Sequence, residues 1–317
     1  MTSNCNLCPR HCGANRECGK VGVCGAGAKA QVALADLHLW EEPPITGEHG
    51  SGAIFFSNCP LKCIYCQNRQ ISREGKGKEV TPAELANMML ELQSRKATNI
   101  NLVTGTHYLD DIEKALALLG KLDAQEIDNP DLQREVFAAQ HDKLTIPIVW
   151  NTSSYEAVET IHRLNKFVDI YLADFKYFSN ELGKKLSKVD DYFEVATSAI
   201  KAMLEPNPDG KRADVIVRHL ILPGHVEDSK RVINHVHDTF GDDVVLSIMN
   251  QYTPVLKTAA DSGDAWSQKQ LEKSPELART VFDEEYEEVL DYADSLGIED
   301  YFWQDGETCK ESFIPEF

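Results

Sequence analysis

The chain has 317 residues, of which 42% are hydrophobic and 26% are charged, a composition typical of a soluble globular protein with one large domain and extensions. Its net charge of −19 argues against nucleic acid as a partner, since phosphate binding needs a basic surface. The sequence lacks both a run of eighteen apolar residues and an apolar signal segment, so we expect a cytoplasmic protein without membrane contact.

The cysteines are concentrated near the N-terminus, where eight of the nine fall within the first 66 residues. In a large chain without an export signal, such clustering predicts metal binding rather than disulfides. We expect a second four-cysteine site formed by Cys5, Cys8, Cys12 and Cys24. Cys18 or His11 could replace one of these ligands. The bound group is either structural zinc or an accessory iron–sulfur cluster, and the sequence does not decide between them. The alternative is free thiols in a disordered arm.

After a linker at 31–50, apolar runs that are typical of buried strands alternate with amphipathic helical stretches. The predicted strands are 52–57, 99–104, 146–152, 168–174, 214–222 and 244–251. The predicted helices are 81–95, 109–120, 154–165, 179–203 and 227–239. Thr81, Pro82 and Glu84 form the start signal of the first helix.

Six β–α repeats predict an α/β fold, with a parallel sheet curled into a partial (β/α)6 barrel of the TIM type. We divide the chain into a Cys-rich N-terminal segment (1–50), the barrel (51–252) and an acidic helical C-terminal extension (253–317). Residues 121–144 are interpreted as an insertion that is either surface decoration, which we favour, or a substrate-facing lid. Two helices are expected in the extension, near 268–281 and 283–296. Residues 261–317 contain 17 acidic and 4 basic residues, which we interpret as solvated helix faces.

The most informative stretch is Cys59-Pro-Leu-Lys-Cys63-Ile-Tyr-Cys66, which directly follows the apolar run 53–56. Three thiolates on one loop can bind three irons of a 4Fe–4S cluster, and the fourth iron then stays open to a substrate or cofactor. The alternatives are a zinc knuckle, which would need a fourth ligand from elsewhere, and unreactive buried cysteines.

Polar residues follow each predicted strand, at the end where the sites of parallel barrels form. Each has a simpler explanation: a turn at Thr104–His107, a helix cap at Asn151, an ion pair between Asp174 and Lys176, and a charge pair at Arg218. Their common location is the reason to expect a binding site for a charged, polar cofactor.

The spacing C-x3-C-x2-C, with the aromatic Tyr65 before the last cysteine, resembles the radical S-adenosylmethionine (SAM) superfamily. Cys66-Gln-Asn68, Asp174-Phe-Lys176 and Arg218-x4-Pro223-Gly224 look like the pattern of pyruvate formate-lyase activating enzyme. The phrases Cys-Asn-Leu-Cys-Pro-Arg-His-Cys-Gly, Glu-Glu-Pro-Pro-Ile-Thr-Gly, Asn-Leu-Val-Thr-Gly-Thr-His and Val-Arg-His-Leu-Ile-Leu-Pro-Gly-His are similar to the branch called pyruvate formate-lyase activating enzyme-like.

The resemblance implies that Cys59, Cys63 and Cys66 hold a 4Fe–4S cluster whose open iron binds SAM. It also implies that Tyr65 lies near the adenine, that Asn151 lies near the ribose, and that Asp174 and Lys176 meet the methionyl end. Thr104, Gly105 and Thr106 replace the Gly-Gly-Glu that usually meets the methionyl amine, which is a departure from the usual pattern. Asn68, Arg218 and Gln251 are further expected neighbours of the cofactor. No role is implied for His107, His219 or His225.

The expected activity is reductive cleavage of SAM to a 5′-deoxyadenosyl radical that abstracts hydrogen from a substrate, and the resemblance suggests a glycyl radical enzyme as that substrate. Radical modification of another peptide or a small molecule is the alternative, and a non-catalytic electron carrier is a third reading. Flavodoxin or ferredoxin is the expected electron donor, because nothing in the sequence resembles a flavin or nicotinamide site.

Overall fold

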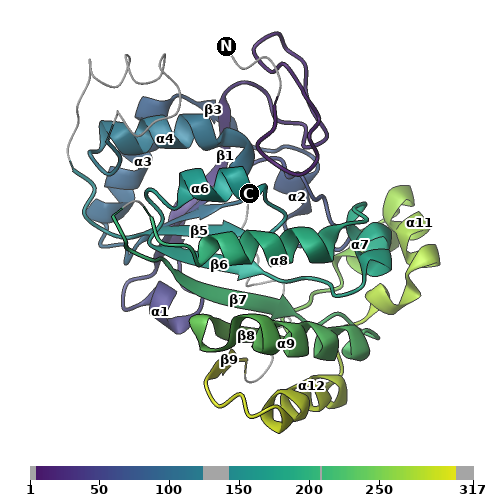
Figure 1. Ribbon diagram of the computed structural model, residues 1–317. Coiled ribbons are helices and arrows are strands. Elements are labelled where there is room, and N and C mark those ends of the chain that lie inside the picture. Colours follow the sequence, from purple (N-terminus) through teal and green to yellow (C-terminus); the bar gives the residue numbers. More distant parts are fainter. Residues whose placement is uncertain (1–4, 124–142, 208, 305–317) are drawn as a thin grey trace.

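The computed structural model describes residues 5–123, 143–207 and 209–304 (Figure 1). Its centre is one open, nine-stranded sheet in the order β3-β1-β2-β4-β5-β6-β7-β8-β9. The predicted insertion at 121–144 lies almost wholly outside the described residues, so that interpretation stays a prediction.

All six predicted strands are present, and each pairs in parallel with the next. They are β2 (Ser51–Phe56), β4 (Ile100–Val103), β5 (Ile148–Thr152), β6 (Ile170–Asp174), β7 (Asp214–Leu220) and β8 (Val245–Met249). The prediction of a partial barrel is therefore confirmed, and the sheet does not close because β3 and β9 form its two edges.

Three strands toward the edges of the sheet were not predicted from the sequence. β1 (Ala30–His38) pairs antiparallel with both β2 and β3 (Lys78–Val80), and β9 (Tyr301–Trp303) pairs in parallel with β8. Residues 31–50 are therefore more than a linker: they hold most of β1 and the short helix α1 (Pro43–Thr46). Outer strands carry weaker apolar patterns than buried central strands, which explains why they were missed.

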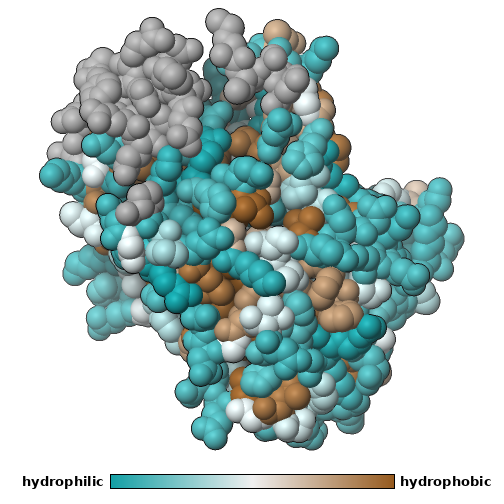
Figure 2. Space-filling view, in the orientation of Figure 1, coloured by the Kyte–Doolittle hydropathy of each residue, from teal (hydrophilic) through white to brown (hydrophobic). Residues whose placement is uncertain are grey.

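Helices cover the sheet between the strands, and α6, α8 and α9 lie across the face seen in Figure 1. The helices that follow the central strands are α3 (Pro82–Ser94), α4 (Leu109–Leu118), α6 (Val158–Leu164), α7 (Asn180–Ser187), α8 (Tyr192–Met203) and α9 (Val226–Phe240). α3 begins with the predicted capping box, in which Thr81 and Glu84 satisfy each other's backbone amides. The exposed side of this layer is largely hydrophilic (Figure 2).

One predicted helix, 179–203, is wrong as a single element. α7 ends at Lys188, whose φ of 59° is left-handed and cannot continue a helix, and α8 begins only at Tyr192. The break has a consequence for the site, because it leaves Leu186 and Ser187 free to contact the loop of Cys63.

The C-terminal part contains α10 (Val255–Asp261), α11 (Ala265–Lys273) and α12 (Asp283–Ser295). The predicted helix 268–281 is corrected, since α11 stops before Pro275, where a 3-10 turn begins. The remaining short helix, α2 (Arg69–Ser72), follows the cysteine loop. Buried apolar residues of the first 50 and of the last described 50 residues belong to the same core as the barrel. The division into three segments stays a prediction. No described helix is long and apolar enough to cross a membrane.

Candidate cofactor site at the carboxyl ends of the strands

The cysteine loop and the polar strand ends surround one cavity of about 260 Å³. Cys59, Cys63 and Cys66 all line it. Each of their sulfurs is a hydrogen-bond acceptor: Cys59 Sγ accepts from the Leu61 amide (3.4 Å), Cys63 Sγ from Ser187 Oγ (3.0 Å) and Cys66 Sγ from Ser72 Oγ (3.4 Å). Donors directed at sulfur stabilise thiolates, which is the form that binds iron.

The loop is held in place by backbone contacts. The Ile64 amide donates to Leu186 O (2.8 Å), and the Arg73 guanidinium donates to Lys62 O and Cys63 O. Asn58 and Lys62 adopt positive φ angles of 73° and 51°, which let the chain fold tightly around the sulfurs. The loop is thus fixed independently of any bound group.

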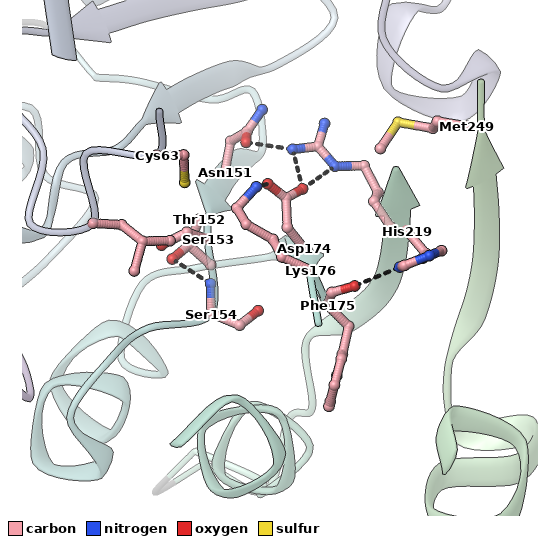
Figure 3. Close-up of polar contacts among 12 residues, drawn as sticks. Cys63, Asn151, Thr152, Ser153, Ser154, Asp174, Phe175, Lys176, His219 and Met249 are labelled. Atoms are coloured by element: carbon pink, nitrogen blue, oxygen red, sulfur yellow. Dashed lines mark hydrogen bonds and ion pairs between the residues drawn. The ribbon is translucent and has the colours of Figure 1, made fainter. Parts of the chain in front are cut away.

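Opposite the cysteines lies a network of charged and amide side chains (Figure 3). Asp174 is bonded both to Lys176 Nζ (2.6 Å) and to Arg218 Nε (2.9 Å), and Arg218 Nη2 donates to Asn151 Oδ1 (2.6 Å). The three charged side chains are 11 to 18% exposed. Burial opposes ionisation of Asp174, but the Arg218 and Lys176 cations outweigh it and lower the pKa of Asp174. Burial likewise opposes the Lys176 charge, and Asp174 outweighs it and raises the pKa of Lys176.

The structure places most of the predicted cofactor residues on this cavity. They are Tyr65, Asn68, Thr104, Asn151, Asp174, Lys176, Arg218 and Gln251. Asn151 is the last residue but one of β5 and does not cap a helix, since α6 begins at Val158. The ion-pair interpretation of Asp174 and Lys176 is also correct, so the pair is preformed before any ligand enters.

Gly105 and Thr106 lie behind the cavity wall. A Cβ at Gly105 would stand 2.8 Å from Ile112 Cδ1 and 2.9 Å from the Trp150 ring, so Gly105 is needed for packing. The Thr106 hydroxyl donates to the buried Glu156 carboxylate (2.5 Å). In this structure Thr104 is the member of the three-residue stretch that reaches the cavity.

The three histidines have structural partners. His107 is buried, its Nε2 bonds to Ser57 O (2.8 Å), and burial lowers its pKa to about 4. His219 lies between Phe175 O (2.7 Å) and Ser229 Oγ (2.9 Å), as Figure 3 shows for the first contact. His225 Nε2 lies 3.4 Å from Glu276 Oε1.

Glu41 was missed as a site residue. It precedes α1, yet its side chain enters the cavity, where Oε2 lies 3.2 Å from Arg218 Nη1 and Oε1 accepts from Asn101 Nδ2 (3.0 Å). Burial raises its pKa to about 7, against the opposing effect of Arg218. The only signal in the sequence was the phrase Glu41-Glu-Pro-Pro, because the strand that leads to it was not recognised.

A chain of buried hydroxyl groups connects the cavity wall with the cluster loop. Tyr65 Oη lies 2.7 Å from Tyr177 Oη, which lies 2.7 Å from Ser187 Oγ, which donates to Cys63 Sγ. A thiolate can only accept, so the Ser187 proton points to Cys63, and Tyr177 and Tyr65 must each donate toward sulfur. The Ser187 hydroxyl, which donates to Cys63 Sγ, is therefore itself polarised by the hydrogen bond that it accepts from Tyr177.

The N-terminal cysteines lie outside this cavity but close to its loop. Arg16 Nη2 donates to Cys5 Sγ (3.1 Å) and Cys24 Sγ (3.6 Å). Cys5, Cys8 and Cys12 are half-buried, Cys24 is buried and Cys18 is exposed.

Across residues 5–123, 143–207 and 209–304, no three Cys, His, Asp or Glu side chains converge as the ligands of a single metal ion do. The cysteines of an iron–sulfur cluster bind different irons and so need not converge on one point.

Comparison with known proteins decides the family. The family model described as "Radical SAM superfamily" matches residues 53–236, which is more than half of the chain. The chain belongs to the radical SAM superfamily. A 4Fe–4S cluster and SAM are therefore implied as its cofactors. Three thiols with donors to each sulfur, beside the Asp174–Lys176–Arg218 network, fit an anionic cluster and a zwitterionic amino acid.

Three relatives can be named. The chain is 29% identical over 306 residues to the uncharacterized protein MJ0674 of Methanocaldococcus jannaschii, with coverage of 93% of this chain and 76% of that one. Similar solved structures include Streptococcus suis SuiB bound to the precursor peptide SuiA (12% identity, TM-score 0.48, 78% of this chain). Another is HydG, a maturase of the [FeFe]-hydrogenase (13% identity, TM-score 0.46, 81% of this chain). The chain spans 46% and 52% of these two proteins.

Proposed function

We propose that this chain cleaves SAM reductively and uses the resulting radical to abstract hydrogen from a protein partner, in the manner of the pyruvate formate-lyase activating enzyme-like branch. The partner we infer is a glycyl radical enzyme. The observation that carries the proposal is the single cavity in which Cys59, Cys63 and Cys66 face Asp174, Lys176 and Arg218. When bound, the cluster and SAM supply a 5′-deoxyadenosyl radical.

The chain's own residues bind and orient the cofactor. Lys176 offers a buried cation to a carboxylate, and Asp174 offers a carboxylate to an ammonium group, both from the end of one strand. Arg218 and Asn151 hold Asp174 and each other in place from the neighbouring strands, so that binding needs little rearrangement. A preorganised network of this kind favours one orientation of the methionyl end.

A protein substrate is supported by the rim of the cavity. Trp40 lines the cavity and is 59% exposed, and its neighbour Leu39 is 56% exposed. Trp303 on the edge strand is 57% exposed and lines an adjacent cavity together with Trp40. Large apolar side chains beside a site mark surfaces at which protein partners bind. We expect flavodoxin or ferredoxin to deliver the electron that the cluster needs.

The test has two steps. The anaerobically reconstituted, dithionite-reduced protein should release 5′-deoxyadenosine from SAM, and the Cys59→Ala/Cys63→Ala/Cys66→Ala variant should not. Absence of 5′-deoxyadenosine release, together with an EPR spectrum that SAM leaves unchanged, would contradict the radical SAM activity and favour a non-catalytic electron carrier. In the second step, pyruvate formate-lyase is added and its glycyl radical is sought by EPR. Release of 5′-deoxyadenosine with no such radical would contradict the activase assignment and favour another substrate.

A further inference from the structure

The N-terminal cysteines have features that free thiols do not need. The Ala26 amide, two residues after Cys24, donates to Cys24 Sγ (3.4 Å). The same arrangement recurs at Cys59, whose sulfur accepts from the Leu61 amide. Amide donors directed at sulfur stabilise the charge of a thiolate, which is the form that binds metal.

A positive charge and a glycine lie beside these sulfurs. The Arg16 guanidinium is placed between Cys5 and Cys24, where it compensates the excess charge of a thiolate-bound metal. A Cβ at Gly22 would stand 2.4 Å from Cys12 Sγ, so a larger residue there would displace that sulfur. The backbone closes around the group through the Cys5 amide to Ala14 O (3.2 Å) and the Gly13 amide to Cys5 O (3.2 Å).

This segment is also fastened to the loop of the catalytic cluster. Arg10, between Cys8 and Cys12, donates to Pro60 O (3.0 Å), Ser187 O (3.2 Å) and Lys188 O (2.7 Å). Pro60 directly follows Cys59, and Ser187 is the residue whose hydroxyl donates to Cys63. One guanidinium thus links the N-terminal cysteine segment to Pro60 of the catalytic loop and to the end of α7.

A second contact lies at the other end of the segment. Gly25 has a φ of 89°, and a Cβ there would stand 3.1 Å from Asn58 Oδ1 and 3.5 Å from Lys62 Nζ. Asn58 and Lys62 are the two residues of the catalytic loop with positive φ. Arg10, two residues after Cys8, and Gly25, the residue after Cys24, therefore both lie against the loop that holds Cys59 and Cys63. Figure 1 shows the N-terminal loop, in purple, beside the main body of the sheet.

We infer that Cys5, Cys8, Cys12 and Cys24 form a second, thiolate-bound metal centre, and that Arg10 transmits its order to the loop of the catalytic cluster. The ligand class is an iron–sulfur cluster, because its cysteines bind different irons, whereas the described side chains do not converge on a single metal ion as zinc ligands do. A segment with so few apolar residues depends on such a metal for its order. Arg10 is a positioning residue. Its effect on the catalytic loop rests on the proposed function, whereas the metal centre does not.

The metal centre is tested in the full chain carrying Cys59→Ala, Cys63→Ala and Cys66→Ala, which cannot hold the catalytic cluster. This protein is purified without oxygen, reconstituted with ferrous iron and sulfide or with Zn²⁺, and analysed for metal by mass spectrometry. We expect about four irons per chain, and about one zinc instead would overturn the assignment of a cluster. Adding Cys5→Ser and Cys8→Ser should abolish this metal, and adding Cys18→Ser, at an exposed position, should not.

Two results overturn the metal centre: a metal-free triple variant that is folded by circular dichroism, or equal loss of metal in the Cys5/Cys8 and Cys18 variants. If the Cys5/Cys8 variant does not fold, the triple variant alone is treated with a chelator. Loss of its metal, together with loss of protection of the N-terminal segment from proteolysis, supports the centre. Failure of SAM cleavage in the unmodified chain would contradict the proposed function and leave these results unchanged.

The coupling is tested with Arg10→Gln in the otherwise unmodified chain. We expect the N-terminal metal to be retained, while the catalytic cluster is lost several-fold faster to a chelator and its EPR spectrum broadens. Arg95→Gln, a surface arginine that pairs with Asp36, is the matched control and should behave like the unmodified chain. An Arg10→Gln protein with unchanged cluster retention and an unchanged spectrum would overturn the coupling.

Discussion

The two groups of cysteines use similar local chemistry in opposite settings. The loop at 59–66 lines an open cavity, and a network of ionisable groups faces it. The N-terminal group is enclosed by its own turns and by Arg16, and in the described part of the chain none of its cysteines reaches that cavity. Catalytic metal sites keep one position accessible, whereas structural sites close it. The difference teaches that the surroundings of the sulfurs, and not the sulfurs themselves, separate an open setting that a ligand can enter from an enclosed one.

The strongest way to break this comparison is to remove one catalytic ligand. Cys63→Ala should abolish the cluster and reduce 5′-deoxyadenosine release to the background, because the three-cysteine loop has no spare ligand. Iron content and product release measure the effect. Cys18→Ala, which lies outside both groups, should be active; a Cys63→Ala protein that retained activity would show that the loop is not the reactive centre.

The network opposite the cysteines predicts a somewhat smaller effect. Lys176→Met should weaken SAM binding by about 10- to 100-fold, since a charge-assisted hydrogen bond contributes about 1.5–3 kcal/mol. Titration of the SAM-induced change in the cluster's EPR spectrum gives the affinity. Lys184→Met is the control, because that side chain is 71% exposed on α7. Equal affinities of the two variants would remove Lys176 from the cofactor site.

The pH dependence of stability tests the ionisation of the buried Glu156 carboxyl group, which follows β5. Burial raises the pKa of Glu156 from 4.5 to about 7 in the folded protein, although Thr106 and Thr152 donate to it. Between these two values the unfolded state holds fewer protons than the folded state, so stability falls as pH rises through this window. Glu156→Gln should not show that loss.

Urea unfolding is measured without oxygen from pH 5 to pH 8. As the pH rises, the free energy of unfolding of the unmodified chain should decline more than that of Glu156→Gln. Glu159→Gln, at an exposed position of the neighbouring helix α6, should follow the unmodified chain. Parallel pH curves for all three proteins would contradict the assigned ionisation.

The smallest expected effect concerns the hydroxyl chain that ends on Cys63. Ser187→Ala removes one hydrogen bond to the thiolate, worth about 1 kcal/mol, or about 40 mV for a one-electron couple. The reduced cluster carries more negative charge than the oxidised cluster, so it loses more stabilisation when the hydrogen bond is removed. The reduction potential should therefore fall. An EPR-monitored redox titration measures the shift. Ser198→Ala, exposed on α8, should leave the potential unchanged, and an unchanged Ser187→Ala value would show that the chain does not act on the cluster.

The sequence alone determined the six parallel strands and the catalytic loop, because both depend on local patterns. Buried central strands are continuous apolar runs, and the ligands of the cluster lie within eight residues of one another. Residues at the ends of parallel strands meet at one edge of the sheet, which is why Asp174, Lys176, Asn151 and Arg218 could be grouped from their positions in the chain.

The tertiary structure decided what no local pattern records. The sequence could not show that an outer strand carries Glu41 into the cavity or that a left-handed residue ends α7 and brings Ser187 to Cys63. It also could not show that Arg10 spans the two cysteine groups through contacts with residues 50 and more than 170 positions away. These contacts depend on the packing of distant segments, and their energies arise only when the whole sheet is assembled.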